Sequence, residues 1–125
     1  MSKYHLRRKE KAITDNKTIQ SILKKGKFTT IALCRGNEPY IVTLNYGYDE
    51  KESALFFHCA KEGLKLDFIK VNNKACATII EDKGYLTGEC DHAYRTLILW
   101  GEMQIIEDLN EKKHAIDVML HHLET

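Results

Sequence analysis

The stretch with the most chemical potential is Phe57 to Lys65, which reads FHCAKEGLK. A predicted strand ends there, a short turn follows, and a helix begins. The N-terminus of a helix presents free N–H groups and the positive end of the helix dipole, which suits a phosphate. Lys61 and Lys65 share a face if the turn is helical, and Gly63 lets the backbone approach an anion closely. The spacing therefore predicts a phosphate site, with a pair of exposed helix lysines as the alternative.

A second candidate is one face of the strand predicted at 40–48. Successive residues of a strand point to opposite faces, so Ile41, Thr43, Asn45 and Gly47 share one of them. Small polar side chains on such a face can line a flat ligand, with main-chain groups bonding the edge of that ligand. The alternative is an ordinary solvated strand face.

Arg95 and Trp100 lie on a third candidate, a strand that is otherwise apolar. Because burying an unpaired charge is costly, Arg95 needs a carboxylate, an opposing subunit or a ligand as partner. Trp100 is more typical of a core or an interface than of a stacking platform. The sequence contains no nucleophile–base arrangement, Walker loop or GxGxxG motif, which favours a cofactor-dependent or a binding role.

The cysteines at 34, 59, 76 and 90 include no CxxC pair. The basic N-terminus is not followed by the apolar stretch of a secretory signal. Reduced thiols in a cytoplasmic protein are therefore expected. Cys90-Asp91-His92 does not follow a standard zinc pattern, so no metal is expected, and no apolar run approaches the ~18 residues of a membrane span.

The length of 125 residues predicts a single domain, 1–125. Its composition, 43% hydrophobic and 30% charged, is that of a soluble globular protein. The formal net charge of +1 hides a basic segment, because residues 1–27 carry a net charge of +7. Such a segment is either a solvated arm or a contact for an anion, meaning a phosphate, an acidic partner or RNA.

The order of predicted elements favours a mainly β (α+β) fold. A helix capped by Asp15 or Thr14 and stopped by Gly26 precedes three strands joined by short turns, which indicates an antiparallel meander. A short helix, two further strands and a terminal helix follow. Because the strands are mostly consecutive, we expect a small antiparallel barrel with flanking helices. The strands are expected at 28–35, 40–48, 54–59, 75–80 and 94–107, the later helices at 62–71 and 110–123, and a loop at 81–93.

The chain resembles the nitroimidazole-reductase branch of the pyridoxamine 5'-phosphate oxidase-like flavoproteins, which share the FMN-binding split β-barrel. The segments 6–14, 39–48, 55–72 and 94–108 carry the likeness. The most specific part is FFHCAKEGLK, with Cys59 where the family often has serine. Family members usually continue into a further strand after the helix matching 110–123. Since this sequence stops at Thr125, we expect the barrel to do without that strand or to be completed differently.

The resemblance implies a homodimer with FMN at the subunit interface. Lys61 and Lys65 would hold the phosphate, and His58 and Cys59 would lie beside the phosphate or the ribityl chain. The segment 43–47 would run along the flavin ring, and the N-terminal arginines would reach the phosphate or the partner subunit. The implied cofactor-binding residues are Thr43, Leu44, Asn45, Tyr46, Gly47, His58, Cys59, Lys61, Gly63, Lys65, Arg7 and Arg8.

Three functional hypotheses follow. The first is an FMN-dependent oxidoreductase that reduces a small molecule such as a nitroaromatic or a substrate related to pyridoxamine phosphate. The second is a non-catalytic flavin-binding or storage module, since a fold does not fix a function. The third, a nucleic-acid-binding barrel, is disfavoured because the basic arm offers only Tyr4 for stacking. The bound group could also be another flavin, a deazaflavin or haem.

Overall fold

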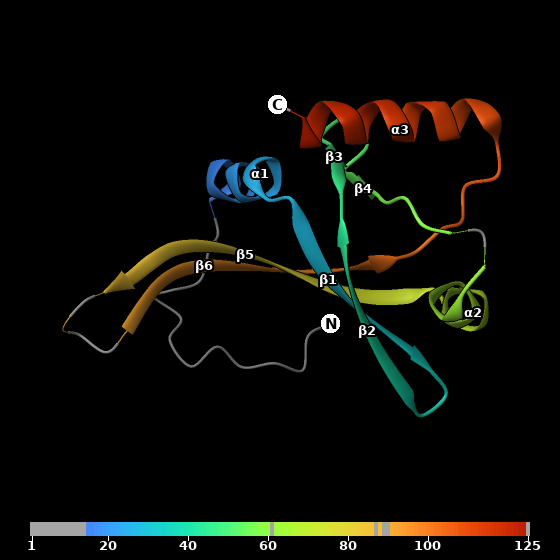
Figure 1. The fold of residues 1–125 in the computed structure, drawn as a ribbon, viewed down its shortest axis with the longest axis horizontal. Coiled ribbons are helices and arrows are strands. Elements are labelled where there is room, and N and C mark those ends of the chain that lie inside the picture. Colours follow the sequence, from blue (N-terminus) through green and yellow to red (C-terminus); the bar gives the residue numbers. More distant parts are fainter. Residues whose placement is uncertain (1–14, 61, 87, 89–90, 125) are drawn as a thin grey trace.

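The computed structural model describes residues 15–60, 62–86, 88 and 91–124, which form an α+β fold (Figure 1). No helix in these ranges combines the length and the apolar character needed to cross a membrane. The helices and strands, in chain order, are α1 (Asn16–Lys25), β1 (Phe28–Arg35), β2 (Glu38–Asn45), β3 (Gly47–Asp49), β4 (Ala54–Phe56), α2 (Leu64–Val71), β5 (Lys74–Leu86), β6 (Asp91–Glu102) and α3 (Leu109–Leu123).

The strands form two antiparallel sheets. The larger sheet has the order β2-β1-β5-β6, and β3 pairs with β4 in a second sheet of two strands. The β1–β2 hairpin confirms the first part of the expected meander. The expectation that 40–48 is one strand and that 54–59 continues the same sheet was wrong. The chain leaves the larger sheet at Tyr46, and the strand that follows has its own partner.

The loop expected at 81–93 was also wrong, because β5 and β6 continue through most of it. Asp82 pairs with Tyr94 and Tyr85 with His92, with a register shift between Asp82 and Tyr85. Gly84, which has a φ of +97°, lies in that shift, where a bulge favours glycine. This extension of β5 and β6 is held together by pairing between the two backbones. Its sequence therefore lacks the alternation of a half-buried strand.

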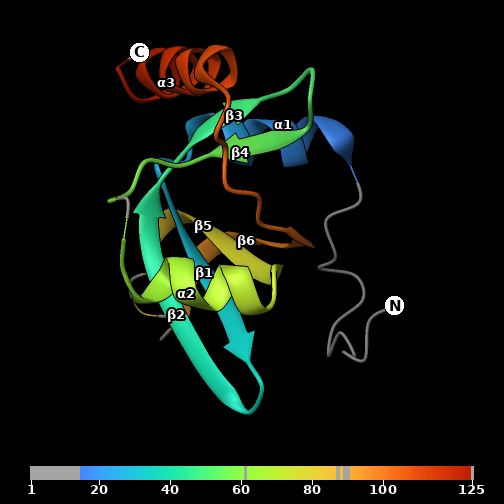
Figure 2. The same cartoon turned by 90° about the vertical axis from the view of Figure 1, so that its right-hand side faces the viewer.

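Two clusters of buried residues share the inner face of the larger sheet. α1 contributes Ile22 and Leu23 to the first cluster, as the helical spacing of Ile19, Ile22 and Leu23 in the sequence predicts. α2 contributes Leu66, Phe68 and Ile69 to the second and lies across β1 and β2 (Figure 2). The two helices therefore cover different parts of one face.

The opposite face of the larger sheet, here called the outer face, carries large exposed apolar side chains from all four strands. The register places these residues on one side, because directly opposed pairs point to the same face. They are Phe28, Ile41, Ile80, Ile98 and Trp100, with exposed fractions of 57–67%. The sequence of 94–101 is apolar on both faces, which is typical of a strand covered on both sides. The described part of this chain covers only one of them.

α3 lies over β3, on the side of the molecule away from the larger sheet (Figure 1). In the sequence of this helix, Ala115, Ile116, Met119, Leu120 and Leu123 recur at helical spacing and predict one buried stripe. That prediction is only partly correct. Ala115 is buried, whereas Ile116 and Leu120 are 49% and 50% exposed. The helix rests on a narrow sheet of two strands, which covers fewer of its side chains than a broad sheet would.

His122 is buried and ties α3 to two other segments. The Tyr48 N–H donates to its Nδ1 at 3.3 Å, and its Nε2–H donates to the Gly26 carbonyl at 2.7 Å. The Lys27 ammonium donates to the His122 carbonyl at 2.6 Å. Backbone groups therefore set the tautomer of the ring, since the Tyr48 amide can only donate.

We expect His122→Ala to lower the free energy of unfolding by ~2–4 kcal/mol, because it opens a cavity and leaves two backbone groups without their partner. Urea denaturation followed by circular dichroism measures the change. His121→Ala is the matched control, since His121 is exposed and such a change costs at most ~0.5 kcal/mol. Equal stability of the two variants would contradict the prediction.

Candidate functional site

Within the described part of the chain, the edge of the larger sheet at β2 presents unpaired backbone groups. The Tyr46 N–H donates to the Lys27 carbonyl at 3.3 Å, which places this pair among the hydrogen-bonded pairs of the β1–β2 ladder. In an antiparallel ladder, hydrogen-bonded and non-hydrogen-bonded pairs alternate. The backbone N–H and C=O groups of Ile41, Thr43 and Asn45 therefore point away from β1, toward the open edge.

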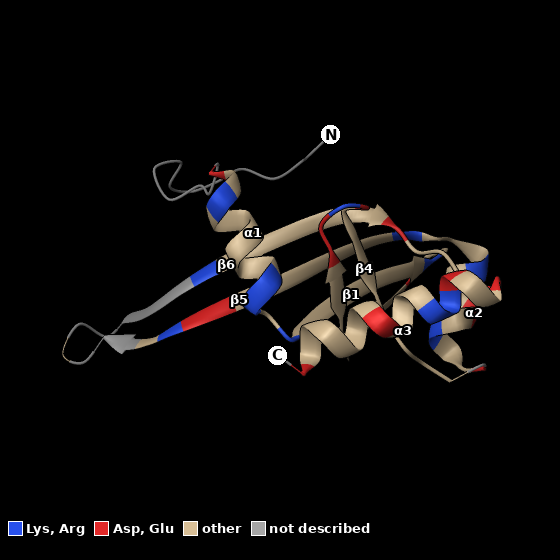
Figure 3. Ribbon diagram, turned by 90° about the horizontal axis from the view of Figure 1, so that it is seen from above, with Lys and Arg blue, Asp and Glu red and all other residues tan. Residues whose placement is uncertain are grey.

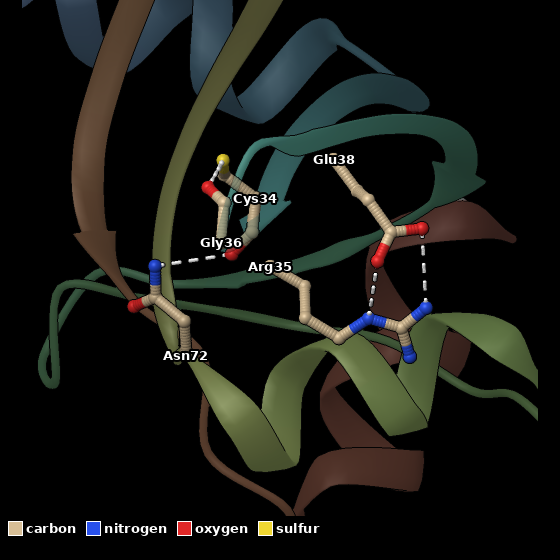
Figure 4. Close-up of polar contacts among 5 residues, drawn as sticks. All are labelled: Cys34, Arg35, Gly36, Glu38 and Asn72. Atoms are coloured by element: carbon tan, nitrogen blue, oxygen red, sulfur yellow. Dashed lines mark hydrogen bonds and ion pairs between the residues drawn. The ribbon is translucent and has the colours of Figure 1, made fainter.

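Pro39 agrees with this assignment and was a sequence signal for it. Proline has no N–H to donate, so it occurs in strands at edges or bulges, and Pro39 falls on the outward-pointing set of β2. The turn before it has Gly36 at a φ of +57°, which fits a two-residue hairpin with glycine first. Arg35 and Glu38 close this turn with an ion pair at 3.2 Å (Figure 4).

Side-chain contacts at the far end of α2 fix its position against the hairpin. The Asn72 amide donates to the Cys34 carbonyl at 3.0 Å (Figure 4), and its oxygen accepts the Lys74 N–H at 3.1 Å. The Arg35 guanidinium lies over the Phe68 ring, 4.4 Å from its centroid. These contacts join α2 to β1 and to the start of β5, and so fix the position of the helix against the sheet.

The N-terminus of α2 differs from that of the other two helices. The Asp15 and Asp108 carboxylates accept backbone N–H groups at the starts of α1 and α3. α2 starts after Gly63, which has a φ of +151° and provides no side-chain cap. Apart from Gly63 and its chain neighbours, no atom of the described residues lies within 4 Å of the position a Cβ would take there, and Lys65 follows in the first turn. This helix end is open to an anion.

The connection from β4 to α2 carries two more of the expected residues. His58 is exposed, whereas Cys59 is half-buried and packs against the same core cluster as Leu44. This connection therefore lies against the inner side of β2, near the start of α2 (Figure 2). Three of the expected residues, Lys61, Arg7 and Arg8, lie outside the described residues.

Thr43 and Asn45 share one strand face with Ile41, as the alternation predicts, and are exposed polar residues on the outer face. The Thr43 hydroxyl lies 2.9 Å from that of Thr30, and the Asn45 amide donates to the Lys27 carbonyl at 3.1 Å. Their side chains are oriented by β1, while their backbone groups point to the open edge. Ile41 offers backbone groups to the same edge, which the expected residue set omits.

Tyr46 points to the opposite, buried side, as the alternation predicts, whereas Gly47 is buried and does not share the exposed face expected for it. Tyr46 is fully buried and its hydroxyl donates to the Leu23 carbonyl at 2.7 Å. Burial raises the pKa of Tyr46 to about 12, so the phenol stays protonated. A Cβ on Gly47 would lie 2.6 Å from the Met119 Cα. Both residues lie in the interior, because the chain turns here into β3.

The partner of Arg95 is a carboxylate. Arg95 and Glu81 are directly paired between β5 and β6, and the Arg95 guanidinium forms an ion pair with the Glu81 carboxylate. Of the three partners that the sequence leaves open, the structure provides one within the chain. Trp100 is 60% exposed on the outer face, which is the environment of an interface and not of a core.

The antiparallel sheets with flanking helices define an α+β protein of the split-barrel type, the expected fold class. Residues 15–125 match the family model described as pyridoxamine 5'-phosphate oxidase. The chain therefore belongs to the pyridoxamine 5'-phosphate oxidase family, as its resemblance predicts. Among curated proteins, none matches the sequence.

Solved structures with the same fold agree with this assignment. A candidate 5-nitroimidazole antibiotic resistance protein from Bacteroides thetaiotaomicron is 28% identical with a TM-score of 0.75, over 88% of this chain and 67% of that one. This likeness supports the expected nitroimidazole-reductase branch. A FAD and heme binding protein from Mycobacterium smegmatis is 18% identical with a TM-score of 0.73, over 89% and 55%. The flavocytochrome Anf3 from Azotobacter vinelandii is 15% identical with a TM-score of 0.80, over 96% and 56%.

The two more distant neighbours show the fold alone. The matched region spans about two thirds of the Bacteroides protein and little more than half of the other two. What those proteins bind therefore bears on this chain only as support for a proposal.

Proposed function

We propose that this protein binds FMN and acts as an oxidoreductase on a small molecule. The observation that carries the proposal is the open N-terminus of α2, with Gly63 at its start and Lys65 in its first turn, in the most specific segment of the family likeness. Membership of the family and the flavin-binding neighbours support flavin binding in general. FMN is preferred to FAD because the start of α2 provides for one terminal phosphate.

The start of α2 fits a phosphate on three counts. It has uncapped N–H groups, the positive end of the helix dipole, and the Lys65 ammonium. The open space around Gly63 lets a phosphate approach the backbone. His58 is exposed on the connection just before this helix and would lie beside the phosphate, as would Lys61.

The edge of β2 fits the ring of a flavin. Backbone N–H and C=O groups of Ile41, Thr43 and Asn45 alternate along the open edge, and the heteroatoms of a flavin ring offer both donors and acceptors to such a row. The exposed Thr43 and Asn45 side chains add polar groups beside it. Bound FMN would supply the redox chemistry, while this chain binds the cofactor, orients it and shields one side of it.

A homodimer fits the outer face. Monomers rarely expose contiguous apolar patches of more than a few hundred Å², and here all four strands contribute large apolar side chains. A second copy of the chain, related by a two-fold axis, would cover the patch with the same patch. The cytoplasm is the proposed location, supported by three described cysteines that are all free thiols.

Lys65→Ala should weaken FMN binding by ~10–100-fold, the worth of one hydrogen bond to a charged group. Fluorescence quenching of added FMN measures the dissociation constant. Lys70→Ala, in the last turn of the same helix, is the matched control and should bind as the wild type does. Lys65→Ala should also lose most of the preference for FMN over riboflavin, because riboflavin lacks the phosphate. An unchanged preference would refute the phosphate role of Lys65.

A reduced nicotinamide donor should bleach the visible absorbance of the FMN-loaded protein under anaerobic conditions. A nitroaromatic substrate should then restore it, because an oxidoreductase must pass the electrons on. Restoration by oxygen alone, with no response to any small-molecule acceptor, would instead identify a flavin-binding module without turnover. Stopped-flow absorbance distinguishes the two results.

Ile98→Arg should convert the dimer to a monomer in light scattering after size-exclusion chromatography, because it places a charge in the centre of the outer face. Ile116→Arg is the matched control, since Ile116 is similarly exposed but lies on α3. A dimer that survives Ile98→Arg and dissociates with Ile116→Arg would place the interface on α3 and contradict the proposal.

A further inference from the structure

Three potential metal ligands from two separate parts of the chain converge beside α3. Asp49 ends β3, Glu52 lies in the turn between β3 and β4, and His114 lies on α3. The His114 Nε2 is 2.8 Å from the Asp49 Oδ2 and 3.6 Å from the Glu52 Oε2. All three ligand atoms lie within 4.8 Å of one another. The turn and α3 both carry acidic positions (Figure 3).

Two of these side chains are held by their surroundings. The Asp49 side chain is only 11% exposed, and its Oδ1 accepts the Lys51 N–H at 3.0 Å, which leaves its Oδ2 directed at His114. The His114 ring meets the Phe56 ring edge-on, with 5.7 Å between centroids. The contact between Met119 on α3 and Gly47 on β3 holds these two elements, which carry His114 and Asp49, against each other. Asp49 and His114 are thus positioned before any ion binds.

One imidazole nitrogen and two carboxylate oxygens are a donor set for a divalent transition metal, with zinc as the best-characterised case. Ligand atoms at ~2.0–2.2 Å from a common ion lie about 3–3.5 Å apart, so the present separations need only small side-chain shifts. We propose that Asp49, Glu52 and His114 bind one divalent transition-metal ion such as Zn²⁺, with water completing its coordination. The ion would fasten α3 to the β3–β4 turn.

A proton competes with the metal at this site. The hydrogen bond to Asp49 raises the pKa of His114, and the charges of Glu52 and Asp117 act in the same direction. Metal binding displaces the proton from Nε2, so the affinity falls as the pH drops below the pKa of His114. The sequence gives no hint of the cluster, because His114 is 65 residues from Asp49.

The proposed metal site is separate from the proposed flavin site. It is built from β3, the β3–β4 turn and α3, and it shares no residue with the edge of β2 or the start of α2. Metal binding and FMN binding can therefore be tested and can fail independently.

Calorimetric titration of untagged protein with ZnCl₂ at pH 7.5 tests the proposal. We expect one ion per chain in the wild type, and affinity reduced by ~10–100-fold or more in His114→Ala, as for the loss of a metal-site residue. His121→Ala, a second exposed histidine on α3, should bind as the wild type does. Glu52→Gln should also weaken zinc binding. Because it alters an exposed side chain, this variant should keep the fold even if His114→Ala does not.

Three results would overturn the metal site. They are no saturable zinc binding by the wild type, equal binding by His114→Ala and the wild type, or equal loss in His121→Ala. The same binding at pH 5.5 as at pH 7.5 would exclude His114 as a ligand. FMN binding by His114→Ala should equal that of the wild type, which separates this test from that of the flavin site.

Discussion

The passage of the chain from one sheet to the other at Tyr46 and Gly47 is the constraint on which the rest of the structure depends. Tyr46 fills the space between the larger sheet and α1, and its hydroxyl bonds the Leu23 carbonyl. The next residue has no side chain, so α3 can approach β3 until backbone meets backbone. A larger side chain at 47 would push α3 away, together with the buried His122 that joins α3 to the start of β1.

This crossing also shapes the candidate site. Because the chain leaves the larger sheet after Asn45, β2 has no further strand beside it in the described part of the chain, and its outward backbone groups stay unpaired. The same departure takes β4 and the connection to α2 around to the inner side of β2, where Cys59 packs. The open strand edge and the open helix end therefore arise from one feature of the topology.

Local signals predicted the helices well and the sheets only in part. Asp15 and Gly26 bound α1 as expected, since caps satisfy backbone groups within a few residues. The alternation at 40–45 was correct because one side of β2 faces the core. The end of the strand at Tyr46 could not be predicted from the sequence. Leu23, which bonds Tyr46, and Met119, which contacts Gly47, are both distant in sequence. The same holds for His122, whose ring bonds Tyr48 and Gly26.

The candidate site was predicted largely through the family likeness and not through physical pattern. Spacing alone left Lys65 as an exposed helix lysine or a phosphate ligand, and the open start of α2 is what favours the second. Pro39 carried an edge signal in the sequence, but a proline in a strand indicates an edge without indicating what lies there. The ligands Asp49, Glu52 and His114 had no sequence signal, because only the packing of α3 on β3 brings them together.

One strand links the proposed cofactor site and the proposed dimer. Ile41 points its side chain to the outer face and its backbone groups to the open edge of β2. A second copy that covers the outer face must therefore extend as far as the open edge of β2. A flavin bound along β2 would then be bounded by this chain on one side and by the second copy on the other. In this arrangement the apolar outer face and the unpaired backbone edge serve one site, which neither chain completes alone.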